Sequence, residues 1–212
     1  MDFGEVIRRR RMVRRYDAER PLPAGLLDHL VDVARRAPSA GFTQGVSFVV
    51  LETTTDRDQF WQATTDPDVP ADRWLTGIRA APGLILVTAS AEAYLDRYAQ
   101  PDKGWTERSE EPWTAPYWFV DAGMASMAIL YAVVDAAAEH AGLGACFFGV
   151  PADRVGQVRS ALGIPSEQFL VGVISVGHRS AEEKPSGSVR RRARRPRAEL
   201  VHHGRWRKES LS

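Results

Sequence analysis

The 212-residue sequence contains only one cysteine, Cys146, and five histidines that are scattered along the chain. A single cysteine excludes an internal disulfide framework and fits a reducing, cytoplasmic environment. The histidines show none of the spacings typical of a metal site, so we expect no bound metal. No histidine or helix start is placed to activate the thiol of Cys146, and we interpret this residue as a small buried side chain.

Nucleotide-binding loops, repeats and targeting segments are also missing. There is no Walker loop, no GxGxxG after a strand and no internal repeat. Met1 is followed by acids and arginines, so we expect no signal peptide. The most apolar segment, residues 118–134, is long enough to span a membrane but carries Asp121. We interpret it as a buried core helix.

The remaining sequence predicts one folded domain over residues 1–212, since 44% of its residues are hydrophobic. Hydrophobic periodicity and capping residues predict helices that begin at Phe3 and cover residues 24–37, 117–140 and 151–163. Apolar runs predict strands at residues 46–52, 83–89, 145–150 and 169–177. These elements favour an α/β or α+β sandwich. Its central helix is so apolar that full burial or a partner must cover it.

Positive charge is concentrated in two short segments. Residues 8–17 and 190–197 hold twelve of the 28 Lys and Arg residues and one acid, Asp17, while the rest of the chain has a net charge of −10. A nucleic-acid binder normally spreads its basic residues along a whole face. Two compact clusters on an acidic body favour a small anion instead.

Five segments, in order, resemble the FMN-dependent nitroreductase family. They are RRRRMVRRYD (8–17), APSAGFTQGVSFVVL (37–51), DAGMA (121–125), GLGACFFG (142–149) and RRARRPRAELVHHGRW (191–206). The resemblance is lost between about residues 55 and 115. It implies an α+β, three-layer sandwich with a mostly antiparallel central sheet flanked by helices. It also implies an intertwined homodimer with two equivalent sites at the subunit interface.

The resemblance implies that both arginine clusters bind the FMN phosphate. The family motif R-[RH]-S-x-[RK] is matched by Arg10, Arg11, Met12 and Arg14, with Met12 in place of the usual serine. Arg10 would contact the phosphate, and Arg14 would lie near the flavin N1 and O2 edge, where a cation favours reduction. In the second cluster the resemblance implies that Arg192 and Arg194 bind the same phosphate, because alternate residues of an extended strand share a side. The other arginines are interpreted as solvated charges: Arg8, Arg9, Arg15, Arg190 and Arg197.

The segment 37–45 resembles the family motif A-P-S-x-x-N-x-Q-P, which in relatives reaches the flavin of the opposite subunit. Pro38, Ser39 and Ala40 would contact the flavin ring and ribityl chain, and Gln44 would support the loop. Two positions depart from the motif: Phe42 stands where the family has asparagine, and Gly45 where it has proline. An apolar ring at position 42 replaces an amide that hydrogen-bonds the flavin edge.

The segment 142–149 resembles the part of the family that lies along the flavin. The resemblance implies that the backbone amide of Gly149, or of its neighbour, donates to flavin N5, with Phe147 and Phe148 beside the ring. From the residues alone, Phe147 and Phe148 would instead alternate into the core of a strand.

The activity implied is ping-pong hydride transfer from NADPH or NADH, through flavin N5, to an oxidised acceptor such as a nitroaromatic or a quinone. No side-chain nucleophile is needed, and no catalytic residue is assigned.

A specialised member of the same fold is the first alternative function: a flavin destructase, a heterocycle dehydrogenase or a dehalogenase. The second is a flavin-independent protein whose arginines bind RNA or another polyanion. We expect a cytoplasmic enzyme with no nucleic-acid or membrane partner.

Overall fold

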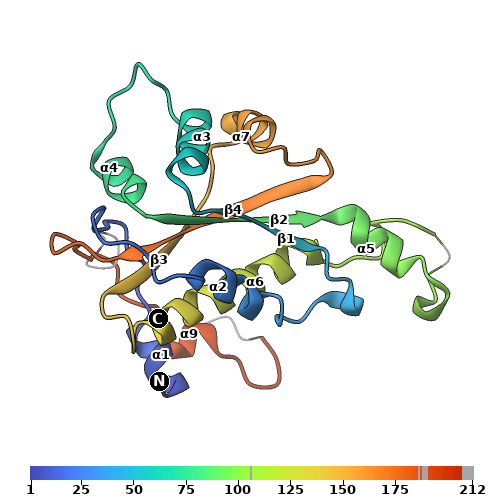
Figure 1. Ribbon diagram of the computed structural model, residues 1–212. Coiled ribbons are helices and arrows are strands. Elements are labelled where there is room, and N and C mark those ends of the chain that lie inside the picture. Colours follow the sequence, from blue (N-terminus) through green and yellow to red (C-terminus); the bar gives the residue numbers. More distant parts are fainter. Residues whose placement is uncertain (106, 186, 188–190, 207–212) are drawn as a thin grey trace. The chain divides into compact units, whose positions relative to one another are not determined.

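The computed structural model describes residues 1–105, 107–185, 187 and 191–206, and divides into two compact units, residues 1–181 and 182–212 (Figure 1). In the first unit the elements are α1 (Phe3–Arg9), α2 (Leu26–Ala34), η1 (Ala40–Phe42), β1 (Val46–Leu51), α3 (Thr54–Thr64), α4 (Arg73–Arg79), β2 (Gly83–Ser90), α5 (Ala91–Tyr98), η2 (Pro101–Lys103), α6 (Tyr117–Ala136), β3 (Leu143–Phe148), η3 (Ala152–Arg154), α7 (Val155–Ala161) and β4 (Gln168–His178). The second unit contains α9 (Arg197–Leu200). One domain over residues 1–212 stays a prediction.

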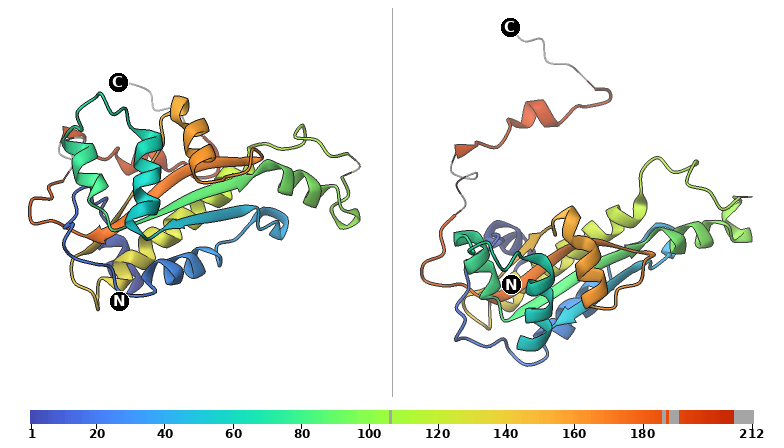
Figure 2. Two further views of the ribbon diagram at one scale, coloured as in Figure 1. Left: turned by 45° about the horizontal axis from the view of Figure 1, so that its top comes forward. Right: turned by 90° about the horizontal axis from the view of Figure 1, so that it is seen from above.

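The sheet of the first unit is antiparallel throughout, with the strand order β1-β2-β4-β3. The central strand β2 is buried along its whole length, as its continuous apolar sequence requires. The strands β1 and β3 are the two edges, and they lie on opposite sides of the sheet in the view from above (Figure 2). This arrangement confirms the α+β class.

Helices cover both faces of the sheet and create two cores. One core joins α2 and α6 to side chains of β2 such as Ile85 and Val87. The other joins α3, α4 and α7 to the alternate β2 residues Leu84 and Leu86. Figure 1 shows these helices as separate layers above and below the sheet. The alternation of β2 side chains therefore produces the three-layer sandwich.

The predicted strands are confirmed to within two residues at each end, but three predicted helices were too long. The helix predicted over residues 24–37 is α-helical only over Leu26–Ala34. The long helix ends at Ala136 instead of residue 140, because turns follow and Gly142, with φ of 91°, leads into β3. The helix predicted over residues 151–163 begins as the 3-10 turn η3, and its α-helical part ends at Ala161. Local periodicity located these elements but not their last turns.

One face of α6 is exposed and apolar. The helix has the length and hydropathy of a membrane span, but half of its most apolar 18-residue window is buried within the chain, as in a core helix. Val120, Met124 and Met127 remain exposed at helical spacing. Beside them, α1 exposes Phe3 and Ile7, and Phe3 contacts Tyr131 of α6. Of the apolar residues Phe3, Val6 and Ile7 of α1, only Val6 is buried.

Candidate functional site

The arginine segment begins where α1 ends and runs along the edge strand β3. Asp2 caps the helix by accepting from the Glu5 amide, which confirms the predicted start. Beyond Arg10, Met12 forms a parallel bridge with Ala145, and the Val13 amide donates to the Ala145 carbonyl at 2.9 Å. Backbone pairing with β3 therefore fixes the position of the segment.

Arg10, Arg11 and Arg14, the arginines of this segment that match the family motif, differ in their contacts. Arg11 turns back onto its own backbone, where Nη1 donates to the carbonyls of Arg8 (2.6 Å) and Arg10 (2.8 Å). Arg14 Nη1 donates to the Met12 carbonyl at 3.1 Å. Arg10 Nη1 is buried and has no hydrogen-bond partner among the described residues. A buried guanidinium nitrogen without an acceptor destabilises the folded chain, so Arg10 is the arginine of this segment that a bound anion would stabilise most.

The outer edge of β3 is open next to this segment. The backbone amide of Arg179 donates to the Gly142 carbonyl, which sets the hydrogen-bonding pattern of the β3–β4 pair. By antiparallel alternation, the backbone groups of Ala145 and Phe147 then point away from β4, toward the open edge. Val13 occupies the edge at Ala145. Within the described part of the chain, the Phe147 and Gly149 amides have no hydrogen-bond acceptor. The edge therefore offers backbone donors beside the arginines.

Phe147 and Phe148 point to opposite faces of the sheet. Phe147 packs against the α2–α6 core. Phe148 stacks on Trp61 of α3, with ring centroids 6.1 Å apart and an interplanar angle of 7°. Phe148, Trp61 and Gly149 line an apolar pocket of about 360 Å³ between β3 and the α3–α4 segment. At most one of the two phenyl rings can therefore lie beside a single flat ligand.

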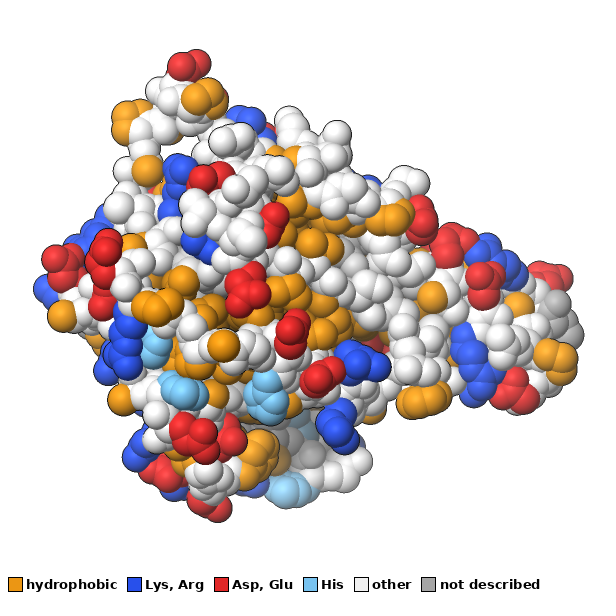
Figure 3. Space-filling model, in the orientation of Figure 1, with side chains coloured by type: hydrophobic (Ala, Val, Ile, Leu, Met, Phe, Trp, Pro, Cys, Tyr) orange, Lys and Arg blue, Asp and Glu red, His pale blue; other side chains and the backbone are white. Residues whose placement is uncertain are grey.

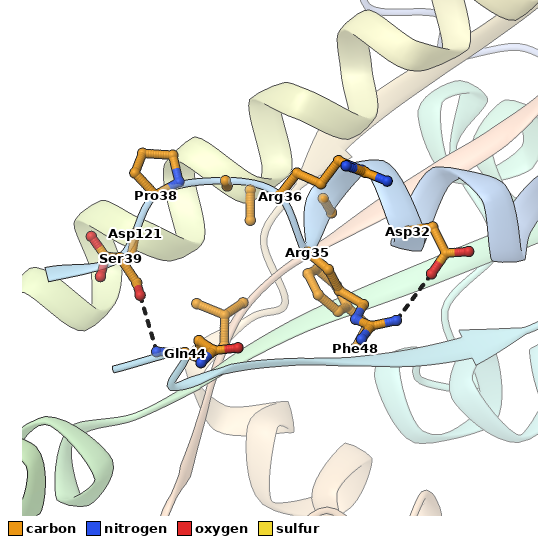
Figure 4. Close-up of a pocket in the computed structure, with 12 residues that line it drawn as sticks. Asp32, Arg35, Arg36, Pro38, Ser39, Gln44, Phe48 and Asp121 are labelled. Atoms are coloured by element: carbon orange, nitrogen blue, oxygen red, sulfur yellow. Dashed lines mark hydrogen bonds and ion pairs between the residues drawn. The ribbon is translucent and has the colours of Figure 1, made fainter. Parts of the chain in front are cut away.

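The loop of residues 38–44 lines a second pocket, of about 490 Å³, against α2, α6 and β1 (Figure 4). Pro38, Ser39 and Gln44 are all at its wall, and Ser39 Oγ accepts from the Gln44 amide at 3.0 Å. On the α2 side, Arg35 points toward Asp32 and forms an ion pair with it. On the surface, hydrophobic side chains gather around the β1 edge, with charged side chains on the helices beside them (Figure 3).

The loop conformation is unusual for its sequence. Phe42 and Gln44 have positive φ angles of 55° and 57°, the only such values for non-glycine residues in the described chain. Phe42 is also 75% exposed. Bulky residues rarely adopt this region, and it persists only where the surroundings impose it.

Two residues that the sequence did not assign to the site hold this loop. Asp121 of α6 is buried, and its Oδ2 accepts from the Ala40 amide at 2.8 Å and from the Tyr94 hydroxyl at 2.6 Å. Asp121 lies within the DAGMA segment that resembles the family, and an acid at a buried position of α6 is the sequence signal for such a role. Tyr94 lies in a segment without resemblance to the family.

One chain does not bring the predicted site residues together. Val49, Leu86, Val173 and Phe148 form one row across the sheet, so the β1 and β3 edges are about 14 Å apart. The loop enters β1, whereas the arginine segment and Gly149 lie along β3. The predicted site residues of the first unit therefore fall into two groups, one at each edge of the sheet.

The second arginine cluster lies in the second unit, where Arg192 and Arg194 are exposed. Arg195 forms an ion pair with Glu199 at 2.9 Å. Arg190 lies outside the described residues. That Arg192 and Arg194 share a ligand with Arg10 stays a prediction.

The described elements form a four-stranded antiparallel sheet between two helical layers, with a basic segment along one edge. A sequence model of the nitroreductase family matches residues 7–178, so the chain belongs to that family.

Solved structures support the same fold over nearly the whole chain. A nitroreductase family protein from Clostridium difficile 630 is similar, with a TM-score of 0.69 and 19% identity over 97% of this chain and 100% of that chain. A Desulfovibrio desulfuricans protein described as a nitroreductase and solved in complex with FMN gives 0.67 and 23%, over 98% and 99%. A Parabacteroides distasonis protein described as an NADH dehydrogenase or NAD(P)H nitroreductase gives 0.65 and 22%, over 97% and 99%.

Proposed function

We propose that this oxidoreductase binds FMN along the outer edge of β3. The observation that carries the proposal is the buried Nη1 of Arg10, which lacks a partner among the described residues, beside backbone donors of that edge that also lack an acceptor there. A phosphate supplies the anionic acceptor that Arg10 lacks. The FMN complexes of the similar proteins from Desulfovibrio desulfuricans and Exiguobacterium sibiricum support the choice of ligand.

The residues fit this cofactor in the following way. Arg10 and Arg11 would hold the phosphate, with Arg192 and Arg194 as the predicted second pair of cations. Met12 stands where the family motif has serine, so one hydroxyl contact to the phosphate would be missing. Arg14 would supply a positive charge at the flavin N1 and O2 edge, which would favour the reduced form. The amide of Gly149 would donate to flavin N5.

When bound, FMN supplies hydride transfer from NADPH or NADH to an oxidised acceptor such as a nitroaromatic or quinone. The description of the Parabacteroides distasonis protein supports a nicotinamide donor. The chain itself supplies orientation, charge at the flavin edge and exclusion of water.

The complete site requires a second copy of the chain. The loop of residues 38–44 lies at the β1 edge, away from the arginines at the β3 edge of the same chain. A twofold dimer lets the loop of one copy, with Pro38, Ser39, Ala40 and Phe42, reach the flavin of the other. The exposed apolar stripe of α6 and α1 gives the dimer an apolar contact surface.

The cofactor proposal is tested on the purified protein. We expect a yellow preparation with a flavin spectrum, from which about one FMN per chain is released on denaturation. Arg10→Ala should weaken FMN binding by about tenfold to a hundredfold, because a charge-assisted contact is lost. A colourless protein that added FMN cannot reconstitute would overturn the proposal.

The dimer proposal is tested by light scattering during gel filtration. Met127→Glu puts a charge into the exposed stripe of α6 and should shift the dimer toward monomer. Val69→Glu is the matched control, because Val69 is an exposed apolar residue in the α3–α4 segment, on the opposite side of the sheet. Equal effects of the two variants, or a wild-type monomer, would contradict the proposed interface.

A further inference from the structure

The loop of residues 38–45 is seated on α5 and α6 through buried polar contacts. Both hydrogen-bond donors to Asp121 come from outside its own helix: the Ala40 amide in the loop and the Tyr94 hydroxyl in α5. Asp121 is 2% exposed. A buried carboxylate with two good donors is stabilised, whereas removing either donor leaves part of its charge uncompensated.

Tyr94 also shapes the end of the loop through its ring. A Cβ at position 45 would lie 2.4 Å from Tyr94 Cε2, which is closer than real side chains come, so only glycine fits there. This contact gives a physical reason for Gly45 where the family motif has proline. Burial first, and then the hydrogen bond to Asp121, raise the pKa of Tyr94, so its hydroxyl remains a donor at any working pH.

Further contacts hold the loop on both sides of Phe42. Arg97 Nε of α5 donates to the Gly41 carbonyl at 3.0 Å, and the ring of Tyr98 lies where a side chain at position 41 would be. Thr43 Oγ1 donates to the Ala40 carbonyl at 2.6 Å. The left-handed conformation of Phe42 is therefore imposed by its neighbours, and it directs the ring out of the chain.

We propose that Asp121 and Tyr94 are positioning residues that fix the 38–45 loop and hold Phe42 outward, as an apolar contact for the acceptor. The target of the loop, a flavin on a second copy, rests on the proposed function. The anchoring itself rests only on contacts within one chain.

Hydrogen exchange of the peptide 37–46, read by mass spectrometry on the full-length protein, tests the anchoring. Asp121→Ala should speed exchange in this peptide by about tenfold, because the Ala40 amide loses its acceptor. Asp121→Asn should restore part of the protection. Tyr94→Phe keeps the ring and removes the hydroxyl, so it should speed exchange without unfolding the chain.

Tyr16→Phe is the matched control. It also removes a buried hydroxyl, which donates to the Val13 carbonyl at 2.7 Å, but it lies in the core on the other face of the sheet. It should leave exchange of the 37–46 peptide unchanged. If Asp121→Ala and Tyr94→Phe behave like Tyr16→Phe in this peptide, the two residues are only structural and the inference is wrong.

Kinetics separate this inference from the proposed function. In a protein that binds FMN, Tyr94→Phe should raise the KM for a quinone about tenfold, and leave FMN affinity and the rate of flavin reduction by NADPH or NADH nearly unchanged. An unchanged KM would overturn the role at the acceptor side. Faster exchange in a protein that never binds FMN would support the anchoring while the proposed function fails.

Discussion

Gly172 of β4 leaves the space that the ring of Phe147 fills across the β3–β4 pair. A Cβ on Gly172 would lie 2.3 Å from Phe147 Cζ. Gly172→Ala should therefore lower the free energy of unfolding by about 1 to 3 kcal/mol, because the phenyl ring must leave its rotamer. Chemical denaturation measures the change.

Gly156 in α7 is the matched control for this substitution, because a Cβ there meets nothing within 4 Å. Gly156→Ala should be neutral or stabilising by about 0.5 kcal/mol. Phe147→Leu combined with Gly172→Ala should recover part of the stability lost by Gly172→Ala alone. Additive losses in the double variant would show that the ring is not the obstacle.

The second arginine cluster should contribute through two specific positions. Arg192→Ala and Arg194→Ala should each weaken FMN binding by about tenfold to a hundredfold, the loss expected for one charge-assisted phosphate contact. Titration of the cofactor-free protein, followed by flavin fluorescence, measures the affinity. Arg197→Ala, in α9, is the control and should change it little. Equal losses at all three positions would indicate a diffuse basic patch.

Phe42 should affect the flavin's chemistry more than its binding. An unpaired flavin heteroatom in a dry site costs about 1 to 3 kcal/mol, so restoring an amide there changes the relative stability of the two redox states. Phe42→Asn should shift the reduction potential and raise turnover with nitroaromatic or quinone acceptors, while FMN affinity stays within about tenfold. Potentiometry and steady-state rates test this. No change in either quantity would mean that Phe42 does not approach the flavin.

His178 should make stability fall in mild acid. It is buried at the end of β4, and its Nδ1 has no partner among the described residues. Burial, and then the charge of Arg20, lower its pKa below the usual 6.5. Below pH 6.5 the unfolded chain takes up a proton that the folded chain does not, so the free energy of unfolding decreases as the pH is lowered.

The measurement is urea unfolding between about pH 7.5 and pH 5.5. His178→Gln should flatten this pH dependence, because the titrating group is gone. His29→Gln, at an exposed position of α2, should leave the slope as it is in the wild type. Parallel curves for all three proteins would assign the slope to other groups.

Local sequence signals were enough to predict the elements but not their contacts. Asp2 and Glu5 indicated the start of α1, and a continuous apolar run indicated the buried strand β2. The strand order could not be predicted, since no local pattern indicates that β3 lies beside β4 at one edge. The roles of Asp121 and Tyr94 depend on a contact between two helices and a loop, so neither helix alone reveals them. The period-two rule did indicate that Phe147 and Phe148 diverge.

The placement of the loop and the arginines at opposite edges of one sheet has a consequence for mixed dimers. In the proposed dimer, a defect in the loop of one copy inactivates the site on the other copy. Arg10→Ala and a loop variant, at FMN concentrations too low to saturate the Arg10→Ala site, would therefore complement each other when their subunits exchange. Half of the dimers would then be mixed, each with one intact site, so about one quarter of all sites would regain activity.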